Sequence, residues 1–259
     1  MTRLPPPSKE LGQHFLVDEN ILSVIGRLAD LDDDDVVLEI GPGAGVLTAY
    51  LADRVALVHA VELDRRLAPH LSDRFGTDDG VRLVFGDALQ LDLTSLDPPP
   101  TKLVSNLPYN VATPIVVESL ETTPTIASWC VMVQRELADR FFAEPRTKAY
   151  GAVSVLVQLA ADRTGFHPVA RTVFRPRPNV DSALVAFRRR PPPRLAWGEL
   201  KRVVEGAFAH RRKRLPNSLE LAGVADRARA AGALGQLGRP PSTRAEELEP
   251  AEFVALAEA

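Results

Sequence analysis

The stretch VVLEIGPGAGVLTAYLA, residues 36–52, decides the fold class of this chain. Val36–Ile40 is a largely apolar run with the length of a buried strand, and a helix is expected to open near Gly45. Between them, Gly41 and Gly43 allow the backbone to bend sharply and to approach a ligand closely. The stretch predicts a strand, a glycine turn and a helix, an arrangement that is also compatible with nicotinamide- or flavin-binding proteins.

Three further strands are expected downstream, and each is followed by a polar side chain. In an open α/β sheet, ligands bind at the carboxyl ends of the strands. An acid after the second strand can accept both hydroxyls of a ribose, and an acid after the third can accept from an adenine amino group. The side chains are Glu62 after Val55–Val61, Asp87 after Val81–Phe85 and Asn106 after Lys102–Ser105.

The segment LVSNLPYNVATP, residues 103–114, adds a candidate site for a planar base. Asn106 supplies one acceptor oxygen, and Pro108 biases Leu107 towards an extended conformation that turns its carbonyl outward. Tyr109 then offers a flat ring. A base with an exocyclic amino group would satisfy all three groups. An isolated tetrapeptide of this kind more often only turns the chain, but the ordered set of glycine loop, two acids and this segment favours a site.

Strands continue to alternate with helices up to a last strand at residues 183–187, which predicts a doubly wound sheet. Three prolines at 191–193 prevent helix or sheet from continuing and mark a domain boundary. We therefore expect a sheet domain at residues 1–190 and a small all-helical domain at 194–259. The helices predicted in the second domain are residues 197–209, 215–221, 225–231 and 250–258.

The composition is that of a cytoplasmic globular protein: 45% of the 259 residues are hydrophobic, and no apolar run approaches 18 residues. The N-terminus lacks the apolar core of a signal peptide. The single cysteine, Cys130, lies among apolar neighbours, which indicates a buried structural thiol. Histidines are scattered and no metal-ligand spacing is found, so neither a membrane nor a metal is expected.

Positive charge is concentrated in one part of the chain. Residues 171–214 hold 13 Lys and Arg against three acids, a net +10, whereas the whole chain has a net charge of −3. This asymmetry predicts a polyanionic partner that one face contacts. The candidate contacts are Arg188, Arg189, Arg190, Arg211, Arg212 and Lys213.

Several motifs, taken in order, resemble the bacterial ribosomal RNA small-subunit adenine dimethyltransferases. They are LGQHFL, LEIGPGAG, VELD, GDAL, NLPYN, KAYGAVSV, VFRPRPNVDSA, RRKRLPNSL and RAEELEPAEFVALA, and they span residue 11 to the C-terminus. The resemblance implies a Rossmann-like methyltransferase sheet with a small helical domain. It also implies dimethylation, with S-adenosylmethionine, of the N6 amines of two adjacent adenosines near the 3′ end of small-subunit ribosomal RNA.

The resemblance also assigns roles to individual residues. The methyl-donor site falls on His14, Leu16, Gly41, Gly43, Glu62, Asp87 and Asn106. Asn106 and Leu107 would accept the hydrogens of the reacting amine, and Tyr109 and Phe174 would sandwich the flipped adenine. The chain departs from the family pattern in carrying His14 where Asn can occur, and Arg214 and Pro216 in the basic segment.

The expected partner is small-subunit ribosomal RNA within a 30S-type particle, and the protein is expected to act as a monomer. One alternative is an antibiotic-resistance methyltransferase of large-subunit ribosomal RNA, which shares the donor site and the Asn-x-Pro-aromatic segment. A catalytically idle ribosome-assembly factor and a nicotinamide dehydrogenase remain as alternatives from other classes. The basic C-terminal helices disfavour the dehydrogenase, and an intact Asp87, Asn106 and Tyr109 disfavour the idle factor.

Overall fold

The computed structural model describes residues 3–8, 10–192 and 194–259. The chain divides into two compact units, and each unit is made of two separate stretches of sequence. One comprises residues up to Ala138 with Arg163–Arg189, and the other comprises Asp139–Asp162 with Arg190–Ala259. The sequence-based division places residues 139–162 in the first domain, whereas they belong to the second unit. Of the three prolines at the expected boundary, Pro193 lies outside the described residues.

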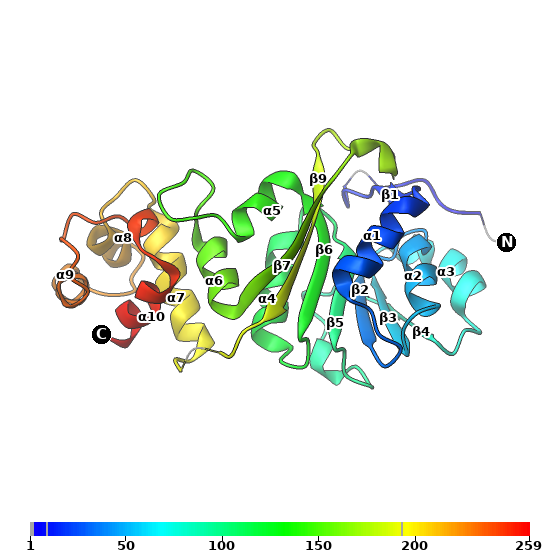
Figure 1. Ribbon diagram of the computed structural model, residues 1–259, viewed down its shortest axis with the longest axis horizontal. Helices are drawn as coiled ribbons and strands as arrows, with labels where there is room; N and C mark the ends of the chain where they lie inside the picture. The colour runs from blue at the N-terminus through cyan, green and yellow to red at the C-terminus, as the bar shows by residue number, and fades with distance from the viewer. Residues whose placement is uncertain (1–2, 9, 193) are drawn as a thin grey trace. The chain divides into compact units, whose positions relative to one another are not determined.

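The first unit is organised around a seven-stranded sheet with the order β4-β3-β2-β5-β6-β9-β7 (Figure 1). Neighbouring strands from β4 to β6 run parallel, and β9 runs antiparallel to β6. The strands are β2 (Val36–Ile40), β3 (Leu57–Glu62), β4 (Val81–Phe85), β5 (Lys102–Asn106), β6 (Ser128–Gln134), β7 (Ala161–Val169) and β9 (Ser182–Arg189).

The order of the strands reverses beside β2. From β2 the chain passes to β3 and then β4 on one side, and it returns to β5 and β6 on the other. The β2–β5 contact is short, with Val37 opposite Lys102 and Leu38 opposite Leu103. The loops after β2 and β5 leave in opposite directions at such a point, which opens a crevice at the carboxyl ends of the strands. The topology therefore positions a site between β2 and β5.

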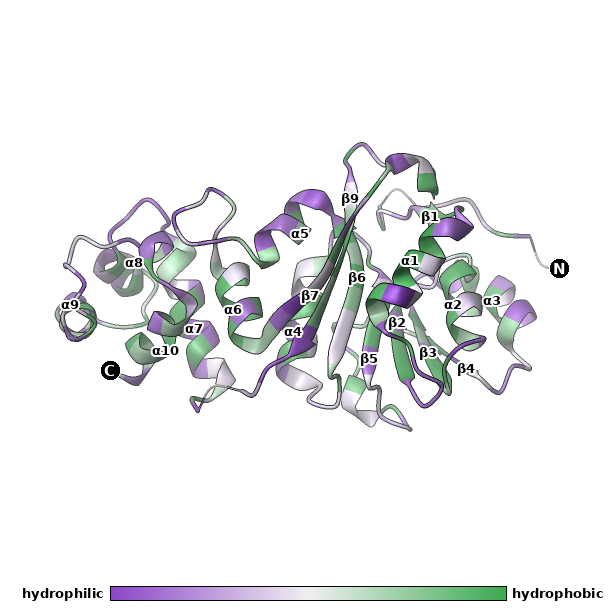
Figure 2. Cartoon of the chain, viewed as in Figure 1, coloured by the Kyte–Doolittle hydropathy of each residue, from purple (hydrophilic) through white to green (hydrophobic). Residues whose placement is uncertain are grey.

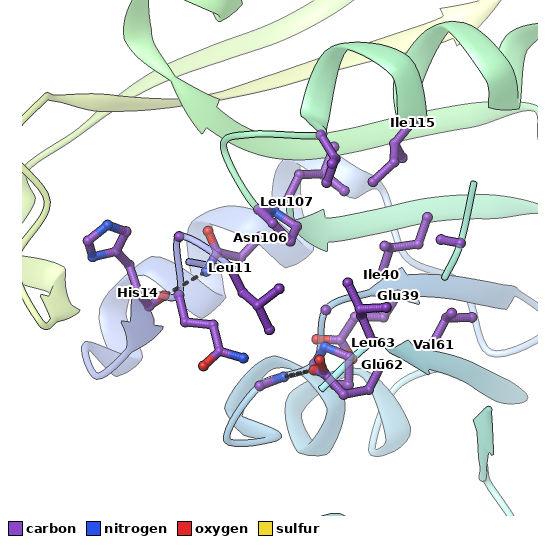
Figure 3. A pocket seen from close by; sticks show the side chains of 18 of the residues that line it. Leu11, His14, Glu39, Ile40, Val61, Glu62, Leu63, Asn106, Leu107 and Ile115 are labelled. Atoms are coloured by element: carbon purple, nitrogen blue, oxygen red, sulfur yellow. Dashed lines mark hydrogen bonds between the residues drawn. The ribbon is translucent and has the colours of Figure 1, made fainter. Parts of the chain in front are cut away.

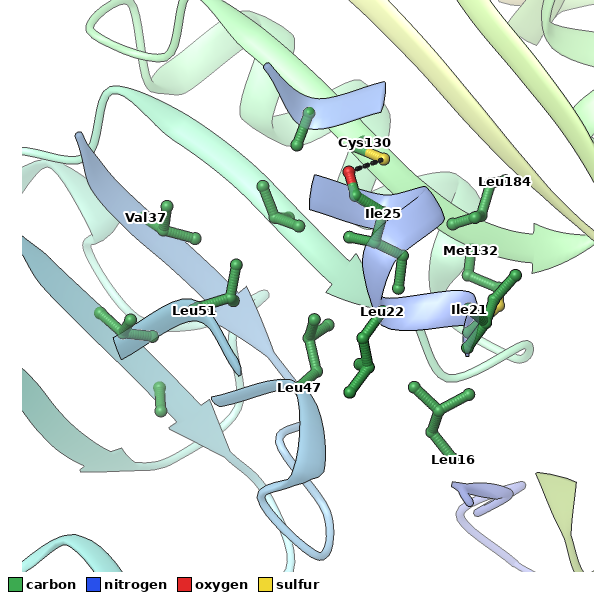
Figure 4. Close-up of a cluster of buried hydrophobic side chains, with 14 of the residues drawn as sticks. Leu16, Ile21, Leu22, Ile25, Val37, Leu47, Leu51, Cys130, Met132 and Leu184 are labelled. Carbon is green, nitrogen blue, oxygen red and sulfur yellow. Dashed lines mark hydrogen bonds between the residues drawn. The ribbon is translucent and has the colours of Figure 1, made fainter. Parts of the chain in front are cut away.

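One face of the sheet is covered by α1 (Glu19–Ala29), α2 (Val46–Ala52) and α3 (Ala68–Phe75) (Figure 1). The core on this face forms because alternate residues of each strand point the same way. Figure 4 shows this cluster, in which helix and strand side chains interlock. Its members include Leu16, Ile21, Leu22, Ile25, Val37, Leu47, Leu51, Cys130, Met132 and Leu184.

The opposite face packs against α4 (Ala112–Thr122). Trp129 lies next to Cys130 in β6 and therefore points to the other side of the sheet. Its indole nitrogen donates to the Ser119 hydroxyl of α4 at 2.9 Å, and its ring stacks on Phe187 of β9. The edge strand β7 is more exposed than the central strands, which agrees with its hydrophilic colouring in Figure 2. The helix α5 (Arg135–Phe141) follows β6.

A separate two-stranded pair ties the N-terminal lead-in to the loop before β9. In it, β1 (Phe15–Leu16) runs antiparallel to β8 (Phe174–Arg175), with Leu16 opposite Phe174. The Val17 amide extends the pair by donating to the Val173 carbonyl at 2.9 Å. This contact fixes the lead-in, residues 10–16, across the carboxyl edge of the sheet.

The second unit is helical, apart from the first two residues of β7. An aromatic cluster of Tyr150, Phe208 and Phe253 forms part of its core, and the Tyr150 hydroxyl donates to the Leu248 carbonyl at 2.8 Å. No described helix is long and apolar enough to cross a membrane. The helices are α6 (Ala152–Ala160), α7 (Trp197–Ala209), α8 (Leu215–Leu221), α9 (Arg227–Gln236) and α10 (Pro250–Glu258).

The predicted α/β sheet is confirmed, with differences at a few element ends. The second strand begins at Leu57 rather than at residue 55. The helix expected at 225–231 runs from Arg227 to Gln236, because the Asp226 side chain accepts from the Arg229 amide and starts the helix there. Cys130 is 1% exposed, as expected for a structural thiol.

Candidate active site

A cavity opens at the carboxyl ends of β2, β3, β4 and β5 (Figure 3). Strand ends, the loops that follow them and residues 10–16 of the lead-in form its walls. It therefore occupies the crevice that the sheet topology predicts. Most of the residues predicted for a donor and base site line this one cavity: His14, Leu16, Gly41, Gly43, Glu62, Asp87, Asn106, Leu107 and Tyr109.

The glycine loop after β2 requires its glycines for both conformation and space. Gly41 and Gly43 have φ values of 77° and 58°, and residues other than glycine rarely adopt such a backbone conformation. A Cβ atom on Gly43 would lie 2.9 Å from the Phe15 ring. The loop therefore presents bare backbone to the cavity.

Glu62, the last residue of β3, holds the glycine loop in place. Its Oε2 accepts from the Gly43 amide at 3.1 Å, and its Oε1 accepts from the Asp64 amide at 2.8 Å. The side chain is 4% exposed, and burial raises its pKa. Each carboxylate oxygen can accept a further hydrogen bond, so Glu62 can bind a pair of hydroxyls while it keeps the loop fixed.

Asp87 lies in the loop after β4 and is already used in part by that loop. Its Oδ1 accepts from the Leu89 amide at 3.0 Å and its Oδ2 from the Gln90 side chain at 3.1 Å. Because the side chain is partly exposed and lines the cavity, its remaining acceptor capacity is available to a ligand there.

Asn106 ends β5 and is oriented by the lead-in. Its Nδ2 donates to the His14 carbonyl at 3.1 Å (Figure 3), which leaves Oδ1 as the acceptor that faces the cavity. The next residue, Leu107, is anchored because its amide donates to the Met132 carbonyl of β6 at 3.1 Å. Within the described part of the chain, no hydrogen bond reaches the Leu107 carbonyl. Two consecutive residues therefore each offer one acceptor oxygen, Asn106 from its side chain and Leu107 from its backbone.

Tyr109 presents its ring to the cavity and is held at its far end. Its hydroxyl lies 2.5 Å from the Ser182 Oγ at the start of β9. The His14 ring lies 5.5 Å from the Tyr109 ring, centroid to centroid, and its Nδ1 lies 2.8 Å from the Pro176 carbonyl oxygen. The side chain of His14 therefore lies beside the predicted base site, although the sequence assigns this residue to the donor.

Phe174 does not reach the cavity. The side chain is 4% exposed and belongs to the hydrophobic core between the sheet and α1–α3. Its pairing with Leu16 across the β1–β8 ribbon directs it inward. Of the expected pair only Tyr109 lines the cavity here, and the enclosure of a base by Tyr109 and Phe174 stays a prediction.

Two groups at the cavity were missed from the sequence. Glu39 is buried within β2 and lines the cavity, and the only signal is a charged residue inside an apolar strand. Gln13 lies in the lead-in, and its side chain donates to Asp64 Oδ2 at 3.0 Å. Asp64 in turn pairs with Arg66, which lowers the pKa of that carboxyl. This chain of contacts helps to hold the lead-in over the sheet edge.

Among the described lining residues, the charged side chains are acidic. No lysine or arginine is found among them, and His14 is the one basic side chain. A cavity of this kind suits a cation and disfavours the phosphates of a dinucleotide. The carboxyl side chains are Glu10, Glu39, Glu62 and Asp87. In the described residues, no group of three or more His, Cys, Asp or Glu side chains is arranged to hold a metal ion.

Arg189, predicted to bind RNA, instead stabilises the first unit. Its guanidinium donates to the carbonyls of Leu120, Thr123 and Ile126 at 2.7–2.9 Å and lies 4.8 Å from the centre of the Trp129 ring. It therefore satisfies carbonyls at the C-terminal end of α4, which lack helical partners. These contacts give Arg189 a structural role, and its binding of RNA stays a prediction.

The other predicted RNA contacts are at the surface and differ in their partners. Arg188 pairs with Asp30 at 3.5 Å, and Arg190 pairs with Asp162 at 3.5 Å. Arg211 pairs with Glu246 and donates to the Thr147 carbonyl. Arg212 and Lys213 are exposed in the turn between α7 and α8, with no ion pair to another described residue.

The family of the chain is shown by its full-length matches. The family model described as "Ribosomal RNA adenine dimethylase" matches residues 7–257. The chain belongs to this family. Similar relatives are named ribosomal RNA small subunit methyltransferase A. One from Rubrobacter xylanophilus is 48% identical over 98% of this chain and 95% of its own length. One from Streptococcus pneumoniae is 43% identical over 97% and 91%.

Two solved structures of adenine and ribosomal RNA methyltransferases share the fold of this rRNA adenine dimethylase family member. A dimethyladenosine transferase from Plasmodium falciparum has a TM-score of 0.79 at 22% identity and covers 94% of this chain and 96% of its own. The 23S rRNA methyltransferase ErmE has a TM-score of 0.67 at 31% identity and covers 94% and 98%. The fold is therefore the Rossmann-like methyltransferase sheet that the sequence predicts.

Family membership identifies an enzyme and excludes the nicotinamide dehydrogenase. The acidic lining of the cavity agrees, because the described residues offer no lysine or arginine for a pyrophosphate.

Proposed function

We propose that the protein dimethylates the N6 amines of two adjacent adenosines near the 3′ end of small-subunit (16S) ribosomal RNA, with S-adenosylmethionine as methyl donor. The end of β5 carries the proposal: Asn106 Oδ1 and the Leu107 carbonyl are two available acceptors beside the ring of Tyr109. The relatives named as small-subunit enzymes are 43–48% identical, against 31% for the 23S enzyme, which supports the small subunit.

The chemistry of the cavity lining fits S-adenosylmethionine. The bare backbone at Gly41 and Gly43 permits close approach, and Glu62 can accept from the ribose hydroxyls. Asp87 can accept from the adenine amino group, and Leu16 adds an apolar wall. When bound, S-adenosylmethionine supplies an electrophilic methyl group on a positively charged sulfur.

The acceptors at the end of β5 act on the amine of the target adenosine. Adenine N6 is a poor nucleophile because its lone pair is delocalised into the ring. When the two N–H groups of the amine donate hydrogen bonds to Asn106 Oδ1 and the Leu107 carbonyl, the nitrogen becomes pyramidal. Its lone pair is then available for the reaction. Holding the amine in line contributes up to about 7–11 kcal/mol through pre-organisation. No strong general base is required for this step.

Tyr109 holds the base after it leaves its stack in the RNA. A base that undergoes chemistry must be extruded from its helix, and stacking on an aromatic ring offsets about 1–3 kcal/mol of that cost. Ser182 fixes the plane of the Tyr109 ring, and His14 lies against it. These contacts support the proposal that an adenine stacked on Tyr109 presents its exocyclic amine to Asn106.

Docking on folded RNA is assigned to the exposed basic side chains. Arg188 belongs to the first unit, and Arg190, Arg211, Arg212 and Lys213 belong to the helical unit. Phosphate contacts position a protein on RNA without reading its sequence. We propose that they bind a 30S-type particle, and that the protein acts in the cytoplasm as a monomer without a metal ion.

The test is a map of dimethylated adenosines in ribosomal RNA from cells with and without the gene. Primer extension stops at N6,N6-dimethyladenosine, so both subunits can be examined in one experiment. We expect two adjacent stops near the 3′ end of 16S RNA that disappear with the gene. Loss of a modification from 23S RNA instead would show that the protein is the large-subunit enzyme. No change in either RNA would contradict both enzymes and favour the catalytically idle assembly factor.

A further inference from the structure

Glu39 differs from the other carboxylates of the cavity because one of its oxygens is left without a partner. The residue lies one position before the end of β2 and is 1% exposed. Its Oε2 is buried and makes no hydrogen bond of normal geometry to a described residue, although the Thr48 hydroxyl of α2 lies close to the carboxyl group. The residue lines the cavity beside Glu62 (Figure 3). Buried polar atoms without a partner are uncommon, and one beside a cavity is a candidate for contact with a ligand.

The surroundings keep Glu39 protonated when no ligand is present. Burial raises its pKa to about 8, with Glu62 of β3 acting in the same direction and the Thr48 hydroxyl of α2 and Arg74 of α3 acting against it. Arg74 and His70 of α3 both reach the Ala44 carbonyl in the glycine loop. A carboxyl group whose pKa is raised this far is mainly protonated at pH 7.

The order of the strands places Glu39 between two groups with proposed roles. Along the carboxyl edge of the sheet, Asp87 follows β4, Glu62 ends β3, Glu39 lies in β2 and Asn106 ends β5. In the proposed function, these positions face the adenine, the ribose and, at Asn106, the amine to be methylated. The sulfur of the donor is bonded to the ribose and carries the methyl group that meets the amine, so it belongs at β2.

We propose that Glu39 is the counter-charge of the sulfonium of S-adenosylmethionine and gives up its proton when the donor binds. The inference rests on the proposed function, because it requires S-adenosylmethionine in this cavity. A positive sulfur beside the carboxyl favours its ionised form. S-adenosylhomocysteine, the demethylated product, has a neutral sulfur and does not favour ionisation. Glu39 therefore makes the site discriminate between donor and product by charge.

Calorimetry measures the proton directly. Titrations of the full chain at pH 7 in two buffers with different ionisation enthalpies give the number of protons released on binding. We expect the release of a large part of one proton per S-adenosylmethionine bound and much less with S-adenosylhomocysteine. Donor and product share the same amino-acid and adenosine groups, so the difference between them reports on the sulfur.

The variant Glu39→Gln is similar in shape to the protonated side chain but cannot ionise. We expect it to abolish the difference in proton release and to weaken S-adenosylmethionine binding about tenfold, which corresponds to one pKa unit. Binding of S-adenosylhomocysteine should change less than twofold. Glu199→Gln, the same change at an exposed position in α7, is the matched control and should behave as the wild type.

A second readout needs no variant. If donor binding expels the proton of Glu39, the affinity of the wild type for S-adenosylmethionine rises as pH increases from 6 to 8, and that for S-adenosylhomocysteine does not. Donor binding without proton release, or equal release with donor and product, would overturn the inference and leave the proposed function intact. Absence of S-adenosylmethionine binding at every pH would overturn both.

Discussion

The hydroxyl of Tyr109 lies 2.5 Å from the Oγ of Ser182, so the ring after β5 is fixed to the first residue of β9. Ser182 is 1% exposed and cannot turn towards solvent. Burial raises the pKa of Tyr109, so its hydroxyl stays protonated in the neutral range and can donate to Ser182. The contact spans 73 residues of sequence and sets the plane on which a base would stack.

Substitutions at Tyr109 and Ser182 distinguish the effect of the stacking ring from the effect of the hydrogen bond that holds it. Ser182→Ala and Tyr109→Phe each remove one hydrogen bond and keep the ring, so each should raise KM for the RNA particle about 2–10-fold. Tyr109→Ala also removes the stacking face and should reduce kcat/KM about 10–100-fold. Steady-state methyl transfer and donor calorimetry measure the two effects. A Tyr109→Phe enzyme as inactive as Tyr109→Ala would show that the hydroxyl, and not the ring, is what matters.

Asn106→Ala should act on turnover rather than on the donor. Loss of one of the two acceptors for the amine should reduce kcat about 100-fold, while the Kd for S-adenosylmethionine changes only a few-fold. Because Asn106 also holds the lead-in through the His14 carbonyl, Gln13→Ala serves as a control that loosens the lead-in and keeps the acceptor. If Gln13→Ala lowers kcat equally, the role of Asn106 is only to hold the lead-in.

Arg189→Ala should destabilise the protein without changing RNA binding specifically. The substitution leaves the carbonyls at the end of α4 without a donor and removes the cation over Trp129, at a cost of about 2–4 kcal/mol in the free energy of unfolding. Chemical denaturation measures this cost. Normal stability combined with weaker, less salt-dependent RNA binding would instead show that Arg189 binds RNA.

The double variant Arg212→Ala/Lys213→Ala should have the opposite phenotype. Both side chains are exposed, so the stability should stay within about 0.5 kcal/mol of the wild type. Binding to 30S particles should weaken, and its salt dependence should fall by about one unit of slope for each phosphate that the variant no longer binds. Arg227→Ala/Arg229→Ala removes the same charge from α9 as a control. Equal effects of both variants would indicate a general charge effect and no docking site.

Glu39 should also make stability depend on pH. Its pKa is raised from 4.5 to about 8 in the folded protein, so the folded state retains a proton that the unfolded chain loses. Stability is therefore lost as pH rises between these values. Glu39→Gln removes this loss, and its Tm relative to the wild type should increase steadily from pH 5 to pH 8. A constant difference across this range would mean that Glu39 is ionised in the folded protein.

The elements that frame the site were predictable because their signals are local. The run Val36–Ile40 and the glycines that follow it specify a strand and a tight turn, and each of Glu62, Asp87 and Asn106 stands beside a strand end. Parallel strands bring such ends to one edge of the sheet. Local pattern therefore located most of the cavity.

What sequence reasoning missed depends on contacts between distant segments. Arg189 looked like one of three adjacent basic residues, and only the alternation along β9 and the position of α4 turn it inward. Phe174 is directed into the core by its pairing with the lead-in. Glu39 was overlooked because its burial follows from the helices above β2. Apart from the single charged residue that Glu39 places in an apolar strand, these contacts leave no pattern in their own stretches of sequence.

The most direct test of the account is methylation of purified 30S particles from cells that lack the gene, with purified protein and S-adenosylmethionine. Mass spectrometry of the digested RNA should show two N6,N6-dimethyladenosines in adjacent positions near the 3′ end of 16S RNA. The Asn106→Ala protein, used at the same concentration, should leave them largely unmodified. Methylation of 23S RNA in place of 16S RNA, or full dimethylation by Asn106→Ala, would contradict the account.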